Sequence, residues 1–286
     1  MKTIMEMCKS YLAEQREMLR RADRDALAPR TVRDYAESLE YRIIPAFGAM
    51  KPRDFRPTHA AQYLRRARDE RRAVRANREI AALASAFNFG LAMGVVESNP
   101  CRGVRRNKER PRSRAVSIEE INALLSVAAE RGVASQMVAM IAVTVALTGR
   151  RRSEILELER SAITAEGIET EDAKTKRFGD RRYLVEWSPL LRQVVGRAQE
   201  LRKSEKFVFP ARSGRPYTDS GFKTERNKLI RAYEAKIGER FWAHDLRALY
   251  VSEMLDRGID PQTHRNEGTM RRVYDRRRVI KVRPLV

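Results

Sequence analysis

The chain has 286 residues, of which 42% are hydrophobic, and a formal net charge of +21 from 59 lysines and arginines against 38 acidic residues. The hydrophobic share excludes a disordered chain. With two cysteines, Cys8 and Cys101, the chain has neither a disulfide framework nor a cysteine-based metal site. The longest apolar run, Met137 to Leu147, is too short to span a bilayer. The positive charge favours nucleic acid over an anionic membrane surface, because each neutralised phosphate releases condensed counterions and no segment has the pattern of a basic membrane-lying helix.

The N-terminal part has helical patterns separated by polar turns. Its first residues lack the apolar core of a signal peptide, so we expect a cytoplasmic protein. Thr31 and Thr58 are candidate N-caps, and Pro45 is expected in a turn. Helices are predicted over residues 11–21, 31–42, 58–73 and 76–93. In the last of them one face is expected to be buried: Ile80, Leu83, Ala84, Phe87 and Leu91. Residues 1–107 are therefore predicted to form a small helical DNA-binding domain.

A strongly basic segment follows, and residues 108–114 are predicted to be a linker. Pro111 within this run favours an extended conformation. A solvated hinge without a partner is one interpretation. We prefer a strap that lies on DNA phosphates, because it joins two basic parts of the chain. The candidate DNA-binding residues here are Arg102, Arg105, Arg106 and Lys108.

The second domain is predicted over residues 115–286. Ser117 and Glu120 have the spacing of a capping box, and Met137 to Leu147 is apolar nearly all round, which indicates a central buried helix that ends at Gly149. Two short strands are expected over 167–170 and 183–187, with a polar turn between them. Ser188 and Pro189 begin another helix, and further helices are predicted over 219–237 and 245–257. The predicted fold class is mostly α with a small antiparallel sheet (α+β).

Three short motifs in this domain carry residues suited to phosphodiester chemistry. They are Thr148-Gly149-Arg150-Arg151-Arg152-Ser153-Glu154, then Ala173-Lys174-Thr175-Lys176-Arg177, then His244-Asp245-Leu246-Arg247, which is followed by His264 and Tyr274. Arginine presents a planar fork of donors that matches phosphate oxygens, so Arg151 and Arg247 are candidates to clamp both non-bridging oxygens. His244 and Arg247 are three residues apart at a predicted helix start and share one face. One helix end can therefore carry both a general acid or base, His244, and a phosphate ligand, Arg247.

The order of these motifs resembles the tyrosine recombinase (phage integrase) family. The family pattern is Thr-Gly-x-Arg-x-x-Glu, a lysine in a β-turn, His-x-x-Arg, a histidine or tryptophan, and a tyrosine near the C-terminus. The matching residues are Thr148, Gly149, Arg151, Glu154, Lys174, His244, Arg247, His264 and Tyr274. The resemblance implies a core-binding domain followed by a catalytic domain, and a 3′-phosphotyrosyl intermediate on Tyr274 with Lys174 as general acid.

The resemblance also implies partners: double-stranded DNA, and a homotetramer on paired sites. No metal or other cofactor is expected, because the covalent link conserves the energy of the phosphodiester bond. Val279, Ile280, Val282 and Leu285 lie in the basic tail after Tyr274, and we expect this tail to contact a neighbouring protomer.

Several alternatives remain open on the sequence alone. Arg150 or Arg152 could be the phosphate ligand in place of Arg151. Lys176 competes with Lys174 as the general acid and is also a candidate DNA contact. His264 follows a segment shorter than in the family, with Thr263 where the family has glycine. This departure favours a smaller role for His264 and keeps a second hypothesis, a catalytically degenerate DNA-binding relic. A type IB topoisomerase-like enzyme is the third.

Overall fold

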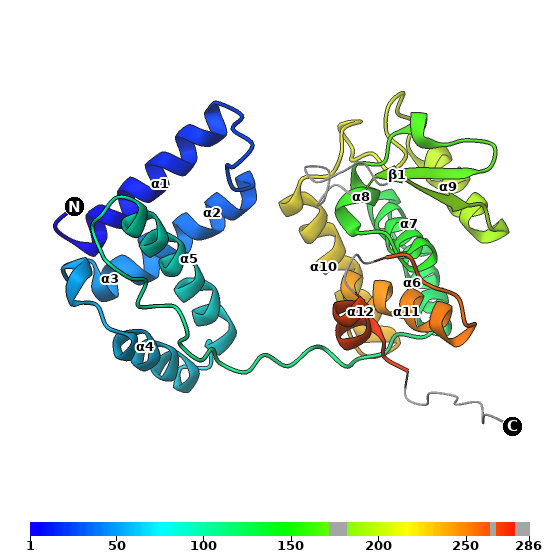
Figure 1. The fold of residues 1–286 in the computed structure, drawn as a ribbon. Helices are drawn as coiled ribbons and strands as arrows, with labels where there is room; N and C mark the ends of the chain where they lie inside the picture. The colour runs from blue at the N-terminus through cyan, green and yellow to red at the C-terminus, as the bar shows by residue number, and fades with distance from the viewer. Residues whose placement is uncertain (172–181, 264–266, 278–286) are drawn as a thin grey trace, which may run out of the picture. The chain divides into compact units, whose positions relative to one another are not determined.

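The structure is a computed structural model that describes residues 1–171, 182–263 and 267–277. The chain divides into two compact units, residues 1–110 and 111–286 (Figure 1). Each unit has its own hydrophobic core of buried side chains. The described part is mostly helical, with one two-stranded antiparallel sheet, which is the predicted fold class.

All the regular secondary structure of the first unit is helical. Its α-helices are α1 (Ile4–Arg20), α2 (Pro29–Ser38), α3 (Ile44–Phe47), α4 (Pro57–Asp69) and α5 (Ala73–Ala92), with a π-helical turn η1 (Leu39–Ile43) and a 3₁₀ turn η2 (Pro52–Asp54). Helix α5 packs against α1 and α4 and forms the centre of the core. Ile80, Leu83 and Phe87 are buried there as predicted, but Leu91 is 44% exposed and that prediction was wrong, because it lies in the last turn of α5.

Three local predictions for this unit were wrong for related reasons. Thr31 and Thr58 do not cap helices, because Pro29 and Pro57 occupy the first helical positions and begin α2 and α4 earlier. Pro45 does not end the helical path. It lies at the start of α3, and the π-helical turn η1 immediately before it joins α2 to α3 without a break.

The second unit is built around a buried helix. Its elements are α6 (Ile118–Ala129), α7 (Val133–Thr148), α8 (Arg152–Leu156), η3 (Arg160–Ala162), β1 (Gly167–Glu171), β2 (Arg182–Glu186), α9 (Pro189–Leu201), α10 (Asp219–Lys236), α11 (Ala243–Asp256) and α12 (Glu267–Tyr274). Helix α7 packs against α6, α9, α10 and α11, as its uniformly apolar sequence predicts (Figure 1). The Ser117–Glu120 capping box before α6 and the Ser188 cap of α9 are both present.

The sheet is small, and one of its faces is buried at Ile168 and Thr170. Ile168 of β1 pairs with Val185 of β2, and Thr170 pairs with Tyr183. Ile168 is buried, whereas Leu184 on the opposite face of the sheet is exposed. The residues between the two strands, 172–181, lie outside the described part of the chain, and so does the predicted turn that contains Lys174 and Lys176.

Candidate active site

The exit from α7 places Arg151. Gly149 ends the helix with φ of 60°, in the left-handed region, and a Cβ at this position would lie 2.3 Å from Cδ1 of Tyr250. Only glycine fits this turn without displacing Tyr250. Two residues later, Arg151 begins α8: its N–H donates to Glu154 Oε2 at 2.9 Å, and its Nη1 donates to Glu154 Oε1 at 2.8 Å. Glu154 therefore orients the Arg151 guanidinium, as a buttress rather than a reacting group.

The other two arginines of this run have different surroundings. Arg150 is buried, donates from Nη2 to the Gln262 carbonyl at 2.9 Å, and lies with Cζ 4.2 Å from the centre of the Tyr183 ring. Arg152 donates to Asp219 Oδ1 at 3.0 Å at the start of α10. These contacts tie Arg150 and Arg152 to neighbouring elements, whereas Arg151 pairs with Glu154 of its own short helix.

Arg247 lies in the buried face of α11. It is 4% exposed, and its Nη2 donates to the Thr263 carbonyl at 2.5 Å. Burial, and secondly the charge of Arg151, lower the pKa of Arg247 to about 10, so it remains a cation at neutral pH. The two guanidinium groups come from separate segments, and the charge of Arg151 disfavours the charged form of Arg247.

Tyr274 ends α12 and meets both residues of the His-x-x-Arg motif. Its hydroxyl lies 3.2 Å from Nδ1 of His244, and Cζ of Arg247 lies 5.7 Å from the centre of its ring. Burial lowers the pKa of His244 below its ordinary value, with smaller effects from neighbouring charges. A neutral imidazole favours acceptance of the phenol proton, because only the neutral ring has a free nitrogen lone pair. His244 is not a helix cap, since Trp242 occupies the N-cap position of α11.

Comparison with known families identifies the family of the chain. The model of the phage integrase family matches residues 114–266, which is more than half of the chain. The chain belongs to the phage integrase family. No curated protein matches the sequence.

Solved structures with a similar fold are integrases as well. The chain is 18% identical to lambda integrase (75-356) in a dimer bound to a COC' core site, covering 97% of this chain and 99% of that one with a TM-score of 0.76. A lambda integrase tetramer bound to a Holliday junction is also 18% identical, with a TM-score of 0.74 and 96% and 80% of the two chains covered. The Tn1549 transposon integrase (aa 82-397) in complex with circular intermediate DNA is 17% identical, with a TM-score of 0.70 and 96% and 95% covered. At these identities the likeness establishes the fold.

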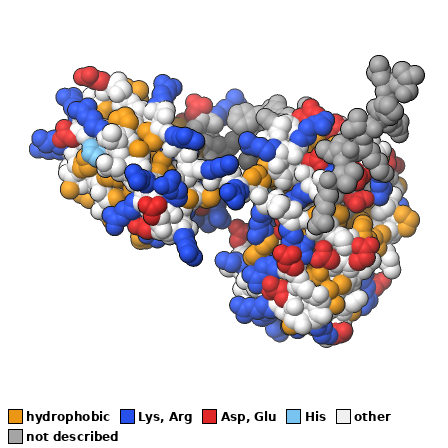
Figure 2. Space-filling model, turned by 90° about the horizontal axis from the view of Figure 1, so that it is seen from below, with side chains coloured by type: hydrophobic (Ala, Val, Ile, Leu, Met, Phe, Trp, Pro, Cys, Tyr) orange, Lys and Arg blue, Asp and Glu red, His pale blue; other side chains and the backbone are white. Residues whose placement is uncertain are grey.

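Three predicted site residues of this phage integrase family member lie outside the described residues: Lys174, Lys176 and His264. The four candidate DNA contacts between residues 102 and 108 all lie in the first unit. Arg102, Arg105 and Lys108 are exposed, and Arg106 is half-buried. Arg105, Arg106 and Lys108 line a groove of about 730 Å³ together with three further arginines: Arg65, Arg68 and Arg110. Figure 2 shows lysine and arginine side chains over the visible face of this unit, with few acidic side chains among them.

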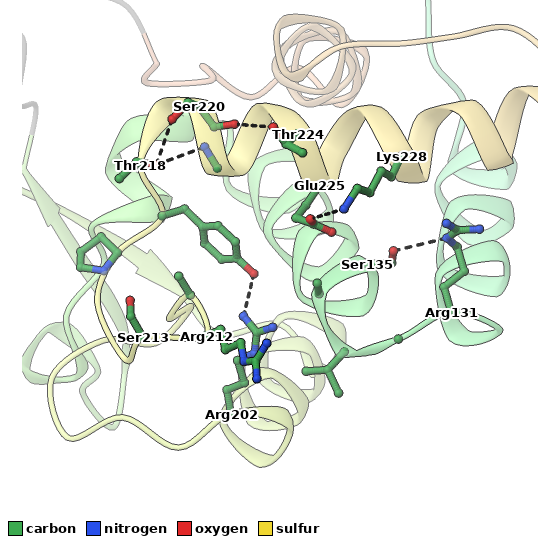
Figure 3. A pocket seen from close by; sticks show the side chains of 17 residues that line it. Arg131, Ser135, Arg202, Arg212, Ser213, Thr218, Ser220, Thr224, Glu225 and Lys228 are labelled. Atoms are coloured by element: carbon green, nitrogen blue, oxygen red, sulfur yellow. Dashed lines mark hydrogen bonds and ion pairs between the residues drawn. The ribbon is translucent and has the colours of Figure 1, made fainter.

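A cavity of about 1020 Å³ lies between the start of α7 and the start of α10 (Figure 3). It is lined by Arg131 and Ser135 at the start of α7 and by residues of the segment before α10, where Arg202 donates to the Tyr217 hydroxyl at 2.9 Å. Thr218 and Ser220 of its lining flank Asp219, the acceptor of the hydrogen bond from Arg152, so the cavity adjoins the first motif at the start of α10. Arg151, His244, Arg247 and Tyr274 are not among the residues that line this cavity.

Two features near Tyr274 were not singled out by the sequence patterns. Asp245 occupies a variable position of His-x-x-Arg and Arg276 lies among several arginines, but both side chains are almost completely buried and they form an ion pair at 2.6 Å. Their separation along the chain hides the pairing. Among the described residues no cluster of His, Cys, Asp and Glu is placed to hold a metal ion, and none of the helices there is long and apolar enough to cross a membrane.

Proposed function

We propose that the chain is a site-specific DNA recombinase, an integrase that cuts and rejoins duplex DNA through a 3′-phosphotyrosyl bond on Tyr274. The observation that carries this proposal is the contact of 3.2 Å between the Tyr274 hydroxyl and His244 Nδ1, beside the buried guanidinium of Arg247. A nucleophile, a proton acceptor and phosphate ligands thus come from three separate segments of one domain.

The reaction would proceed as follows. The Tyr274 oxygen attacks a DNA phosphorus while His244 Nδ1 takes the phenol proton, and the bond from phosphorus to the 5′ oxygen breaks. Arg151 and Arg247 stabilise the negative charge that gathers on the non-bridging oxygens. The departing 5′ oxygen takes a proton from a general acid, for which Lys174 is the candidate. Attack by a partner strand's 5′ hydroxyl reverses these steps and rejoins the DNA, so no nucleotide cofactor or metal is required.

Recombination also needs assembly on DNA, and we extend the proposal to a homotetramer on paired sites. The similar lambda integrase structures are a dimer on a core site and a tetramer on a Holliday junction. In this chain, residues 1–107 would act as the core-type DNA-binding domain, 108–114 as the linker and 115–286 as the catalytic domain. The net charge of +21 and the basic segment before the linker support binding to duplex DNA.

The test is capture of the covalent intermediate. A binding sequence is first selected from a pool of random duplexes, then rebuilt as suicide duplexes with nicks at successive positions. Denaturing gels detect the protein–DNA adduct, and peptide mapping locates the modified residue. We expect the adduct on Tyr274 and its complete loss in Tyr274→Phe, whereas Tyr41→Phe, an exposed tyrosine of the first unit, retains it. An adduct on another residue contradicts the assignment.

Two outcomes separate the proposal from its rivals. Specific binding without any adduct at any nick position supports the degenerate relic, which the short segment before His264 favours. Relaxation of supercoiled DNA that lacks the selected sequence supports a topoisomerase. In the active recombinase, His264→Ala should slow cleavage far less than Tyr274→Phe, because the shortened segment limits the reach of the His264 ring.

A further inference from the structure

The carboxylate of Asp245 connects three segments around the candidate nucleophile. Its side chain is 1% exposed. Oδ2 accepts the N–H of Trp242 at 2.7 Å, which caps the start of α11, and also lies 3.4 Å from Nη1 of Arg112 in the linker. Oδ1 accepts Nη1 of Arg276 at 2.6 Å. A helix cap needs only one of these oxygens. The second oxygen is therefore used for a different purpose, which is to hold Arg276.

Arg276 fixes the backbone that follows Tyr274. Its guanidinium is 6% exposed and donates to the Arg114 carbonyl as well as to Asp245. Its backbone N–H donates to Ser252 Oγ at 2.9 Å, and the Ser252 hydroxyl donates to the Tyr274 carbonyl at 3.3 Å. Ser252 and Asp245 both belong to α11, the helix that carries His244 and Arg247. Helix α11 therefore holds the backbone around Tyr274 and also carries His244, the candidate proton acceptor.

The burial of the pair makes this attachment firm. Separating a buried carboxylate from its guanidinium leaves an uncompensated charge in a low-dielectric environment, which is strongly unfavourable. Other described cations near Tyr274 lack this property: Arg271 pairs with Glu267 on its own helix, and Arg277 pairs with Asp275 nearby in sequence and with the exposed Asp256 of α11. Among the described residues close to Tyr274 in sequence, Arg276 is the cation whose position is set by a buried partner on another element.

We propose that Asp245 is a positioning residue for catalysis, and that its pair with Arg276 holds the Tyr274 hydroxyl within reach of His244. Asp245 does not itself touch the reacting atoms. The inference rests on the proposed function, because its consequence is the rate at which Tyr274 attacks DNA. It predicts slower attack by the Tyr274 oxygen, with DNA binding and protonation of the leaving 5′ oxygen unaffected.

The test compares variants that perturb the pair differently. Asp245→Asn keeps an acceptor oxygen for Trp242 but removes the charge. Arg276→Gln removes the partner cation, and Arg276→Lys restores a cation with fewer donors. Arg257→Gln is the matched control, because it removes an exposed cation that pairs with Glu253 at the end of the same helix. Thermal unfolding and DNA affinity are measured for every variant beside single-turnover cleavage of pre-bound nicked duplex.

We expect Asp245→Asn and Arg276→Gln to slow cleavage about 10²-fold, the usual cost of misplacing a reacting group by about 1 Å. Arg276→Lys should recover part of this loss, and the double variant should be no slower than the worse single variant, because both act through one contact. DNA affinity should not change, and Arg257→Gln should cleave like the unmodified protein. Wild-type cleavage rates in Asp245→Asn, or a slowing that merely follows lost affinity or lost thermal stability in all variants, overturn the proposal.

A duplex with sulfur in place of the 5′ bridging oxygen identifies the affected step. A thiolate leaves without a proton, so this substrate should rescue Lys174→Ala but not Asp245→Asn. Rescue of Asp245→Asn would place its effect on the leaving group and overturn the proposal. Failure of the unmodified protein to form any adduct on this substrate would instead contradict the proposed function, so the two failures are distinguishable.

Discussion

Replacing Arg247 with lysine should separate DNA cleavage from DNA binding. The guanidinium is 4% exposed and donates to the Thr263 carbonyl at 2.5 Å, so its position is fixed before DNA arrives. Lysine retains the charge but replaces a planar fork by one ammonium on a flexible stem. Loss of one such preorganised donor costs about 10²–10³ in rate, or about 2.7–4 kcal/mol of transition-state stabilisation. The Thr263 carbonyl also loses its donor, at a cost to stability of about 1–3 kcal/mol.

The assay is single-turnover cleavage of a nicked suicide duplex at saturating protein, with the dissociation constant measured separately. Arg151→Lys should behave like Arg247→Lys, because Glu154 fixes its guanidinium in a similar way. Arg257→Lys, on the exposed end of α11, controls for a generic arginine substitution in this helix. Cleavage by Arg247→Lys at near wild-type rates, with normal binding, would mean that this guanidinium does not stabilise the transferring phosphate.

Two further predictions concern DNA binding and assembly. Affinity for duplex DNA should fall by orders of magnitude over a few-fold rise in salt, as expected for roughly six or more phosphate contacts. An affinity that does not change with salt in a filter-binding titration would count against binding through the DNA phosphates. Deleting residues 279–286, which lie outside the described part of the chain, should weaken assembly on paired sites while leaving the melting temperature unchanged. Equal synapsis with and without these residues would exclude a role for the tail.

Local patterns predicted most of the regular structure. The apolar run from Met137 to Leu147 lies within α7, and the capping box at Ser117 and the stop at Gly149 were recognisable because each depends on neighbouring residues. The errors arose where two local signals competed. A threonine near a helix start predicts a cap, but Pro29 and Pro57 began their helices earlier because proline suits the first helical turn.

The candidate site was predictable to a lesser degree. Motif order indicated that Arg151, His244, Arg247 and Tyr274 belong together, and the structure places the Tyr274 hydroxyl against His244. The support behind the nucleophile was not predictable, because Asp245 and Arg276 are far apart in sequence and nothing local distinguishes Arg276 from the other arginines around it. Burial decides which of several cations pairs with a carboxylate, and burial is a property of the tertiary fold.

The surroundings of His244 determine the direction in which the pKa of its imidazole is shifted. Burial has the largest effect and lowers the pKa of His244, the Asp245 carboxylate opposes this, and the charges of Arg247, Arg112 and Arg152 lower the pKa further. The Tyr274 hydroxyl also faces the ring. The neutral form of the imidazole is therefore favoured at a pH where an ordinary histidine, with a pKa of about 6.5, is already partly protonated.

This low pKa should appear in the pH profile of cleavage. If His244 Nδ1 accepts the Tyr274 proton, the rate must rise as pH increases through the pKa of His244, and that rise should lie below about pH 6.5. Cleavage measured at subsaturating DNA reports the free protein, so the profile should be recorded under that condition. Asp245→Asn removes the carboxylate that raises this pKa, and should move the rise to still lower pH. His244→Gln, which cannot titrate, should abolish the rise. A rate that falls with increasing pH over the same range would show that the protonated ring is the active form, and His244 would then be a donor to the phosphate.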